Sequence, residues 1–494
     1  MATKIDASLF SWDNPQQLPR LQALMRVLEI LPYQPLVETM AEKRGRGRND
    51  FPTEAMFRLV VAGVVLQYPS AASLLRNLHT NISLAQVCGF NPLPRQQRSK
   101  LLVHQCQDGS YATEQVDYDP RITLPDDWAF SRFLTSMLDT LGERDYLREM
   151  FDLLRDQLME AIPDFAMYLA YDGKAVESHS TGRTNKQTGK TSDTDATWGR
   201  HETVSIDKNG NAWKKVKQWF GYRVHAIIDS VSELPVDYRL TTATDAETQV
   251  LSEMLEGLSE SCPEILDGAK QLSADRGLDA KHLYQTLHDD YDIDPVIANR
   301  NLWSQEKQDG NYDRDKPILR MLNDGKAIDN ILYAEDGTVV CRCPLRGNET
   351  EMCFMGYEKD RNTLKYRCPA KAGGYSCAGE VQCLENGGSK AQRYGRTVRI
   401  KIDESNRRIF TATPRNTKKW KRSYNRRSAA ERFFSRIGQG YNFDHHYVRG
   451  LGKMQAKASL AMAVGLAMAI AHIEAGRPKN MRSLVRPIPL LDSG

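Results

Sequence analysis

Two aspartates follow short apolar runs that have the composition of buried strands. Asp172 lies in Tyr-Asp-Gly-Lys, and Asp275 lies in Ala-Asp-Arg-Gly-Leu-Asp. A carboxylate at the exit of a buried strand is held by a rigid element yet reaches the surface, and its hard oxygens suit Mg²⁺. Either aspartate alone would more often be only the polar end of a strand. The pair therefore gives a hypothesis of a metal site.

A third carboxylate, Glu431, follows Tyr424 and Arg427 at helical spacing. Residues three and four apart share one face of a helix, so these three side chains are expected to be neighbours. Glu431 could form an ordinary ion pair with Arg427, or it could complete a set of three carboxylates. The spacing alone leaves both interpretations open.

Five segments together resemble the DDE transposases of bacterial insertion sequences. The first-aspartate and second-aspartate motifs, the second and third strands, the entry to the next helix and the Y-R-E part of a Y-R-E-K signature all have counterparts. These counterparts are YDGK at 171–174, GYRVH at 221–225 with LP at 234–235, TATDAE at 242–247, ADRGLD at 274–279, and Tyr424, Arg427 and Glu431. The lysine of that signature is replaced by Gly438, and Arg436 lies two positions earlier.

The resemblance implies two-metal phosphoryl transfer, with two Mg²⁺ or Mn²⁺ ions held by Asp172, Asp275 and Glu431. It also implies cleavage of the ends of a mobile element, joining of the 3′-OH ends to double-stranded target DNA, and a homodimer in the synaptic complex. Tyr424, Arg427 and Arg436 would contact DNA. Two alternatives remain, namely an inactive transposase-derived DNA-binding regulator and a host nuclease with an RNase H-like core.

The hydrophobic pattern predicts an α/β fold of the RNase H-like type. Three strands that should pair antiparallel precede a helix, a strand, a second helix and a last strand. The 178–211 segment is expected to be a long polar loop. The predicted elements are strands at 166–172, 222–229, 235–243, 271–275 and 295–298, with helices at 245–258 and 280–288.

The order of these patterns predicts five parts of the chain. They are a helical DNA-binding domain at 1–150, a first part of the catalytic core at 160–299, a β-rich insertion at 300–417, the C-terminal helices of the core at 418–476, and a tail at 477–494.

The N-terminal part is expected to contain short helices joined by tight turns, as in helix-turn-helix DNA readers. Thr53 and Ser70 are expected at helix starts, with Thr53 as an N-cap, and Gly89 is expected to end a helix. A basic stretch precedes these helices and is expected to contact DNA. Its residues are Lys43, Arg44, Arg46 and Arg48.

Basic residues are also concentrated at 390–457, where 19 Lys and Arg face 4 Asp and Glu. Such a segment suits a polyanion, and DNA is the common one. Trp303 follows the last core strand, where it could stack on an unpaired base, although packing is the more frequent role of a tryptophan.

Six of the nine cysteines lie between Cys341 and Cys383. In a reducing compartment such clustering favours a structural Zn²⁺ site, and thiolates suit that ion. The spacing matches no standard zinc finger, so free or buried thiols are the alternative. The four ligands assigned to this site are Cys341, Cys343, Cys368 and Cys377.

The composition is that of a globular protein, with 494 residues, 40% of them hydrophobic and 26% charged. No apolar run reaches the ~18 residues that a membrane span needs. The most apolar stretch, 460–473, is expected to be a buried helix. The first residues lack the layout of a signal peptide, so a cytoplasmic location is expected.

Overall fold

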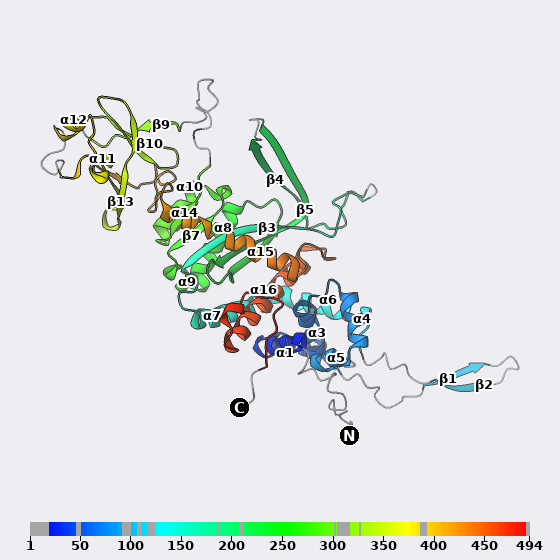
Figure 1. Cartoon of the computed structure of the whole chain (residues 1–494). Coiled ribbons are helices and arrows are strands. Elements are labelled where there is room, and N and C mark those ends of the chain that lie inside the picture. Colours follow the sequence, from blue (N-terminus) through cyan, green and yellow to red (C-terminus); the bar gives the residue numbers. More distant parts are fainter. Residues whose placement is uncertain are drawn as a thin grey trace.

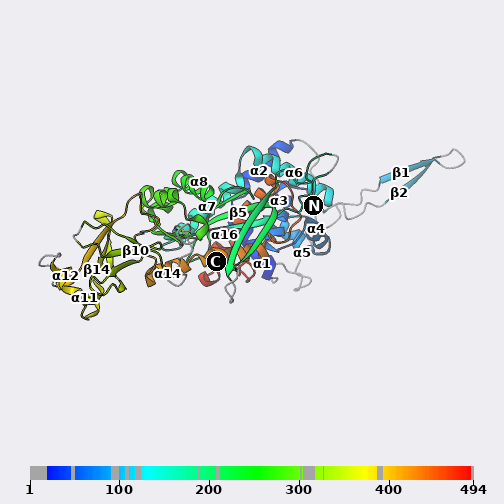
Figure 2. The same cartoon turned by 90° about the horizontal axis from the view of Figure 1, so that it is seen from above.

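A computed structural model describes residues 19–45, 51–90, 100–105, 111–116, 124–185, 188–206, 212–300, 303, 317–325, 328–385 and 393–490. Figures 1 and 2 show an elongated molecule. The N-terminal helices lie toward one end, a small β-rich part lies at the other, and a mixed sheet lies between them.

The central sheet has the order β6-β5-β3-β7-β8. The three strands nearest one edge pair antiparallel, while β3, β7 and β8 run parallel. This is the RNase H-like arrangement that the strand pattern predicted. The strands are β3 (Tyr168–Glu177), β5 (Ala212–Asp229), β6 (Pro235–Thr242), β7 (Gln271–Ala274) and β8 (Asp294–Ile297).

One further strand, β4 (Thr197–Ile206), pairs antiparallel with the first half of β5. The expectation of a loop across 178–211 was therefore wrong in part. The first half of β5, which is rich in lysine and aromatic residues, extends beyond the sheet, and β4 satisfies its backbone hydrogen bonds. The two form a ribbon that stands away from the body (Figure 1).

Helices cover both faces of the central sheet. On one face α8 (Glu247–Ser261) buries an apolar stripe at helical spacing, and α9 (Pro263–Gly268) and α10 (Lys281–Gln285) complete a second core with it. On the other face lie α15 (Ser428–Gly440) and α16 (Leu451–Glu474).

The α16 helix has the length and hydropathy of a membrane span, but 78% of its most apolar window is buried inside the protein. It packs against four N-terminal helices, α1 (Pro19–Ile30), α3 (Thr53–Val65), α6 (Asp127–Glu143) and α7 (Tyr146–Ala161), and against β6. The expectation of a buried helix at 460–473 is confirmed, because both this helix and its neighbours contribute to one continuous hydrophobic core.

The N-terminal part is mostly helical, and it also contains a two-stranded hairpin. A helix starts next to Ser70 and Gly89 ends α5 in the left-handed conformation, as predicted, and Ser70 also caps α4 by accepting a hydrogen bond from the Ser73 N–H. Thr53 is not an N-cap, because α3 already begins at Thr53 and Pro52 holds the cap position. The elements are α1 (Pro19–Ile30), α2 (Gln34–Arg44), α3 (Thr53–Val65), α4 (Ala71–Thr80), α5 (Ile82–Cys88), β1 (Lys100–Gln105), β2 (Tyr111–Val116), α6 (Asp127–Glu143) and α7 (Tyr146–Ala161).

The chain between β8 and α14 (Lys418–Asn425) forms the β-rich insertion. Its two antiparallel sheets have the orders β12-β11-β10-β9 and β13-β14-β15 and share a small hydrophobic core. The elements are β9 (Leu319–Met321), β10 (Ile331–Ala334), β11 (Val339–Arg342), β12 (Glu349–Glu351), β13 (Cys353–Glu358), β14 (Thr363–Arg367), α11 (Pro369–Gly373), α12 (Glu380–Glu385) and β15 (Thr397–Lys401). The domain limits given by the sequence stay a prediction.

Candidate active site

Asp172 lies within β3, in the middle of the sheet. It does not mark the exit of the strand, because antiparallel pairing with β5 carries β3 on to Glu177. The Gly173 N–H donates to Asp172 Oδ1 at 2.8 Å. Burial raises the pKa of Asp172 to about 6, and the nearby Glu247 and Asp275 carboxylates also raise it. Removing a carboxylate from water disfavours its charged form, so the ionised form of Asp172 is less stable here than in water.

Asp275 directly follows β7, the parallel neighbour of β3. The register pairs Ala170 with Ser273, so two further steps along each strand bring Asp172 and Asp275 to the same level. The electrostatic effect of Asp275 on Asp172 agrees with this placement. The parallel register therefore brings together two of the carboxylates that the sequence selected.

Glu431 lies in the first turn of α15, a helix that packs against β3. Its carboxylate accepts a hydrogen bond from Arg427 Nη1 at 2.7 Å, and its side chain is 52% exposed. Arg427 also lies over the Tyr424 ring at 5.6 Å, and it acts electrostatically on both Asp172 and Asp275. The arginine thus connects Glu431 with the two aspartates.

The carboxylates do not form a finished metal centre as they are placed. Within the described part of the chain, no three His, Cys, Asp or Glu side chains have the arrangement of a bound ion's ligands. Glu431 is engaged by Arg427, which supplies the positive charge nearest to it.

A fourth carboxylate, Glu247, reaches the site from the first turn of α8. It pairs with Arg223 of β5, and a Cβ on Gly173 would lie only 3.3 Å from Glu247 Oε1. Glycine at position 173 therefore leaves room for this carboxylate beside Asp172. Sequence reasoning did not select Glu247, although the TATDAE segment ends on it.

Lys174 was also missed, and it lies beside the position where the signature lysine is absent. A Cβ on Gly438 would lie 2.9 Å from Lys174 Nζ and 2.5 Å from Asp444 Oδ2. Lys174 pairs with Asp444 at 2.7 Å. A lysine two residues after Asp172 on β3 thus occupies the space next to the residue that lacks a side chain.

Arg436 is held in a different cluster. It pairs with Glu233, whose side chain is only 3% exposed, and Arg432 and Arg482 pair with the same carboxylate. Hydrogen bonds and charges from these arginines hold the pKa of Glu233 below its usual range, although burial opposes them. This placement fits a structural clamp better than a DNA contact.

Three of the other selected residues lie in described segments away from the acidic site. Lys43 pairs with Glu143 at 2.5 Å, and Arg44 donates to the Phe51 carbonyl at 2.9 Å. Trp303 is 6% exposed and packs edge-on against Tyr333, which fits packing rather than stacking on a base. Arg46 and Arg48 lie outside the described residues.

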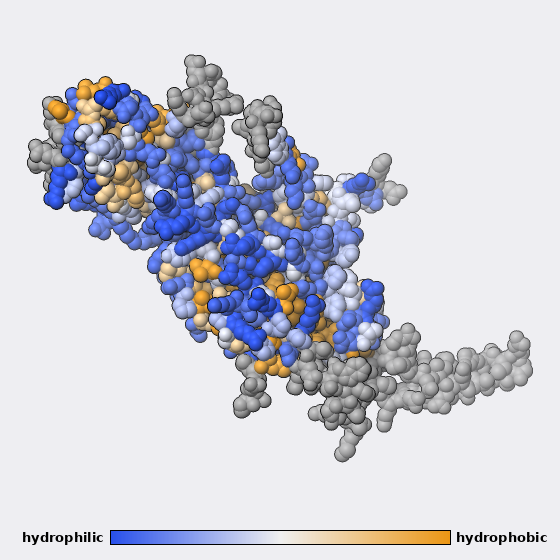
Figure 3. Space-filling model, in the orientation of Figure 1, coloured by the Kyte–Doolittle hydropathy of each residue, from blue (hydrophilic) through white to orange (hydrophobic). Residues whose placement is uncertain are grey.

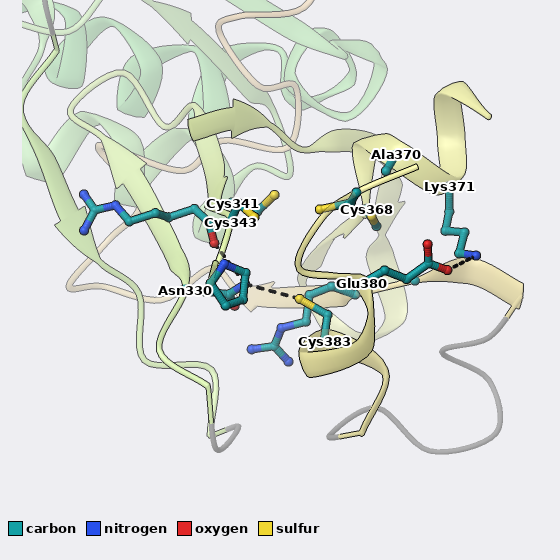
Figure 4. A pocket seen from close by; sticks show the side chains of 13 residues that line it. Asn330, Cys341, Cys343, Cys368, Ala370, Lys371, Glu380 and Cys383 are labelled. Carbon is teal, nitrogen blue, oxygen red and sulfur yellow. Dashed lines mark hydrogen bonds and ion pairs between the residues drawn. The ribbon is translucent and has the colours of Figure 1, made fainter. Parts of the chain in front are cut away.

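The cysteine-rich insertion gathers five thiols around one pocket (Figure 4). Four of them are the selected Cys341, Cys343, Cys368 and Cys377, and Cys383 is the fifth. Burial raises the pKa of Cys341 to about 12, and the neighbouring thiols add to this. Cys353 does not line the pocket. None of the cysteines in the described segments forms a disulfide.

The sheet order, with Asp172 on β3 and Asp275 directly after β7, defines a protein with an RNase H-like core. The family model described as Transposase DDE domain matches residues 168–466, which is more than half of the chain. A second model, described as Transposase domain (DUF772), matches residues 13–100. The chain belongs to the DDE transposase family, as its motifs indicated.

Among solved structures, the chain is similar to the piggyBac transposase in its synaptic complex with hairpin DNA, studied by cryo-EM. The sequence identity is 13% and the TM-score is 0.29. The similarity covers 72% of this chain and 61% of that one. No curated protein matches the chain.

Proposed function

We propose that this protein cleaves the ends of its mobile element and joins the resulting 3′-OH ends to target DNA. The observation that carries the proposal is the parallel register of β3 and β7, which sets Asp172 level with Asp275. Arg427 then links both aspartates to Glu431 on α15. Membership of the DDE transposase family supports the same assignment.

The charge of the site fits a divalent metal. Burial and the negative charges of Glu247 and Asp275 both disfavour the ionised form of Asp172. A bound cation would offset these effects. Asp172, Asp275 and Glu431 would hold two Mg²⁺ or Mn²⁺ ions through hard oxygen ligands. Bound ions would activate the attacking water or 3′-hydroxyl and stabilise the leaving oxygen.

Arg427 has a second role in this proposal. In the structure its guanidinium forms an ion pair with the carboxylate of Glu431. When Glu431 turns to the metal site, the planar fork of Arg427 becomes available for a DNA phosphate, which it can bind through two hydrogen bonds. Tyr424, stacked on Trp420 with ring centroids 4.7 Å apart, lies beside that arginine and would border the same phosphate.

The DNA would run across α14 and α15. The α14 helix exposes lysines and arginines next to Tyr424, and Figure 3 shows hydrophilic residues over the part of this face where Figure 1 shows the two helices. Lys174 would supply the positive charge that, in the Y-R-E-K signature, comes from a lysine at the position of Gly438. The basic stretch at 43–48 and the N-terminal helices would recognise the element ends, and a homodimer would hold two ends together.

A cleavage and strand-transfer assay in Mg²⁺ tests the proposal, using the DNA that flanks the gene. Wild type is compared with Glu431→Gln and with Glu256→Gln, which removes an exposed carboxylate from α8. Wild type and the control should cleave and join, and Glu431→Gln should lose both activities. Cleavage without joining would indicate a nuclease, and binding without cleavage would indicate a regulator.

We also propose that the five thiols supply four ligands to a structural Zn²⁺ ion. Cys343 and Cys377 lie close enough to act on each other electrostatically, and the Asn330 side-chain amide donates to Cys383 Sγ at 3.5 Å. Zinc content measured by mass spectrometry should be one ion per chain. It should fall in Cys343→Ser and stay unchanged in Cys353→Ser, whose thiol lies off the pocket. Zinc-free protein that melts normally would refute this assignment.

A further inference from the structure

The ribbon made by β4 and the first half of β5 has a role that the acidic site does not explain. Residues 212–221 of β5 pair with β4, whereas residues 221–229 pair with β3. The ribbon therefore leaves the central sheet at Gly221. It stands away from the rest of the molecule (Figure 1).

The two faces of the ribbon differ in charge balance. Side chains alternate between faces along each strand, so Arg200, Glu202 and Lys214 share one face. There Glu202 pairs with both cations, and the Lys214 Nζ to Glu202 Oε2 distance is 2.6 Å. This face is internally compensated.

The opposite face has uncompensated positive charge. Lys215 and Lys217 lie on it, flanked by His201 and Trp213, and all four side chains are exposed. Across the described ranges, neither lysine forms an ion pair with an acidic residue. The two exposed lysines suit the charged groups of a polyanion, and the exposed tryptophan beside them suits an apolar part of the same ligand.

The same face continues along β5 to Arg223, on the side of the central sheet that α8 covers, whereas Asp172 pairs with Ala226 and lies on the side of α15. Trp219 follows Lys217 and is 3% exposed, because its ring lies over Gly199, where a Cβ would be 2.4 Å from it. The guanidinium of Arg223 lies over that ring at 5.1 Å and pairs with Glu247. The lysine face thus leads, through Trp219 and Arg223, to Glu247, whose charge acts on Asp172.

We propose that the Lys215 and Lys217 face binds the backbone of the DNA duplex whose cleaved phosphate lies at the acidic site; this inference rests on the proposed function. A two-stranded ribbon fits the major groove of B-DNA. From Lys215 to Arg223 the strand spans about 26 Å at about 3.3 Å per residue. That span corresponds to about 8 base pairs, at about 3.4 Å each.

The test compares two double substitutions that remove equal charge from the two faces of one ribbon. Lys215→Gln with Lys217→Gln alters the proposed DNA face, and Arg200→Gln with Lys214→Gln alters the compensated face. Affinity of the full chain is measured from about 50 to 200 mM salt on a duplex from the DNA flanking the gene. The first variant should bind about tenfold more weakly near 0.1 M salt, with a salt slope smaller by about 2. The second should change binding less than about twofold.

Backbone footprinting supplies the second readout. In wild type, protection should extend about 6–10 base pairs from the cleaved phosphate, and that outer part should be lost in the first variant only. Melting temperatures of both variants should match wild type, because all four side chains are exposed. Cleavage at saturating DNA should persist in both.

Equal losses in the two variants, or unchanged binding and footprint in both, would overturn the ribbon proposal while leaving the transposase proposal intact. A change in sedimentation of the DNA-free protein, with unchanged DNA affinity, would assign the face to a second copy of the chain and would also overturn it. If the wild-type protein neither cleaves nor joins DNA, the proposed function is refuted, whatever the ribbon binds.

Discussion

Individual side chains set the charge of the candidate active site. Asp172 has a pKa of about 6 because it is buried and lies near other carboxylates. Asp193 shows the opposite behaviour, although it too is buried. Hydrogen bonds from Ser178, Tyr222 and the Gly450 N–H lower its pKa below the usual range, outweighing the effect of burial. The charge of Asp172 therefore has few compensating partners, whereas hydrogen bonds stabilise the charge of Asp193.

Asp172→Asn should leave the metal-free protein as stable as wild type or more stable. The unfolded chain releases the Asp172 proton near pH 4 and the folded chain near pH 6, so stability falls as pH rises through this window and stays reduced above it. Thermal unfolding at pH 8 in a chelator should show a melting temperature that is unchanged or a few degrees higher. Asp193→Asn, the matched control, should lose about 1–3 kcal/mol. A markedly lower melting temperature for Asp172→Asn would contradict the shared acidic site.

Gly438→Ala should disturb the Lys174–Asp444 pair, because the new Cβ would lie 2.5 Å from Asp444 Oδ2 and 2.9 Å from Lys174 Nζ. We expect DNA cleavage to fall while the helix itself remains formed. Gly257→Ala is the control, since no atom lies within 4 Å of its added Cβ, and it should stabilise α8 by roughly 0.5–1 kcal/mol. Unchanged cleavage in Gly438→Ala would remove Lys174 from the DNA contacts.

At the scale of elements, the turn between β5 and β6 fixes the helix that carries Glu431. Glu233 lies in that turn with a φ of 60°. It binds Arg432 and Arg436 of α15, and Arg482 of the C-terminal segment. The position of Glu431 relative to β3 therefore depends on a carboxylate almost 200 residues earlier, since the Arg432 contact spans 199 positions.

Glu233→Gln should destabilise the protein by about 1–3 kcal/mol, because three arginines lose their charged partner. Its lowered pKa means that its stabilising effect is present above about pH 4.5 and is lost as pH falls below that value. Denaturant unfolding at pH 7 and pH 4 should therefore differ more in wild type than in the variant. Arg436→Ala should lower stability without changing the salt slope of DNA binding. A changed slope would restore Arg436 as a DNA contact.

The whole molecule depends on contacts that cross its sequence-defined parts. The insertion returns to the core through Arg408, whose guanidinium binds both oxygens of Asp279, at 2.8 and 3.1 Å. Arg415 donates to the Ile297 carbonyl and to the Tyr284 hydroxyl. The N-terminal helices share one hydrophobic core with α15 and α16. Both ends of the molecule are thus packed onto the central sheet.

A double-mutant cycle on Asp279 and Arg408 should give a coupling energy of about 1–3 kcal/mol, since the Asp279 side chain is 0% exposed. The Lys359–Asp292 pair also joins insertion and core, but its side chains are 72% and 71% exposed. Its coupling should be much smaller than that of the Asp279–Arg408 pair, because solvent screens exposed pairs. The measurement is unfolding free energy by denaturant titration. Equal couplings would mean that burial does not determine how the insertion is held.

The sequence alone determined the order and type of the core elements. Alternating and helical hydrophobic patterns depend on local spacing, so the strands around Asp172 and Asp275 and the helix after β6 could be predicted from them. The β4 strand could not, because its largely polar sequence has no buried face of its own and becomes a strand by pairing with β5. Likewise, β3 continues past Asp172 because β5 extends beside it.

Only the tertiary structure decided which charged side chains meet. Glu247 reaches Asp172 because Gly173 leaves space, and Lys174 lies beside Gly438 although 264 residues separate them in the sequence. Arg436 has the residue type of a DNA contact, yet a buried carboxylate engages it. Local patterns carry no information on such contacts. They depend on strand register, helix packing and the space left by absent side chains, all of which arise only when the chain is folded.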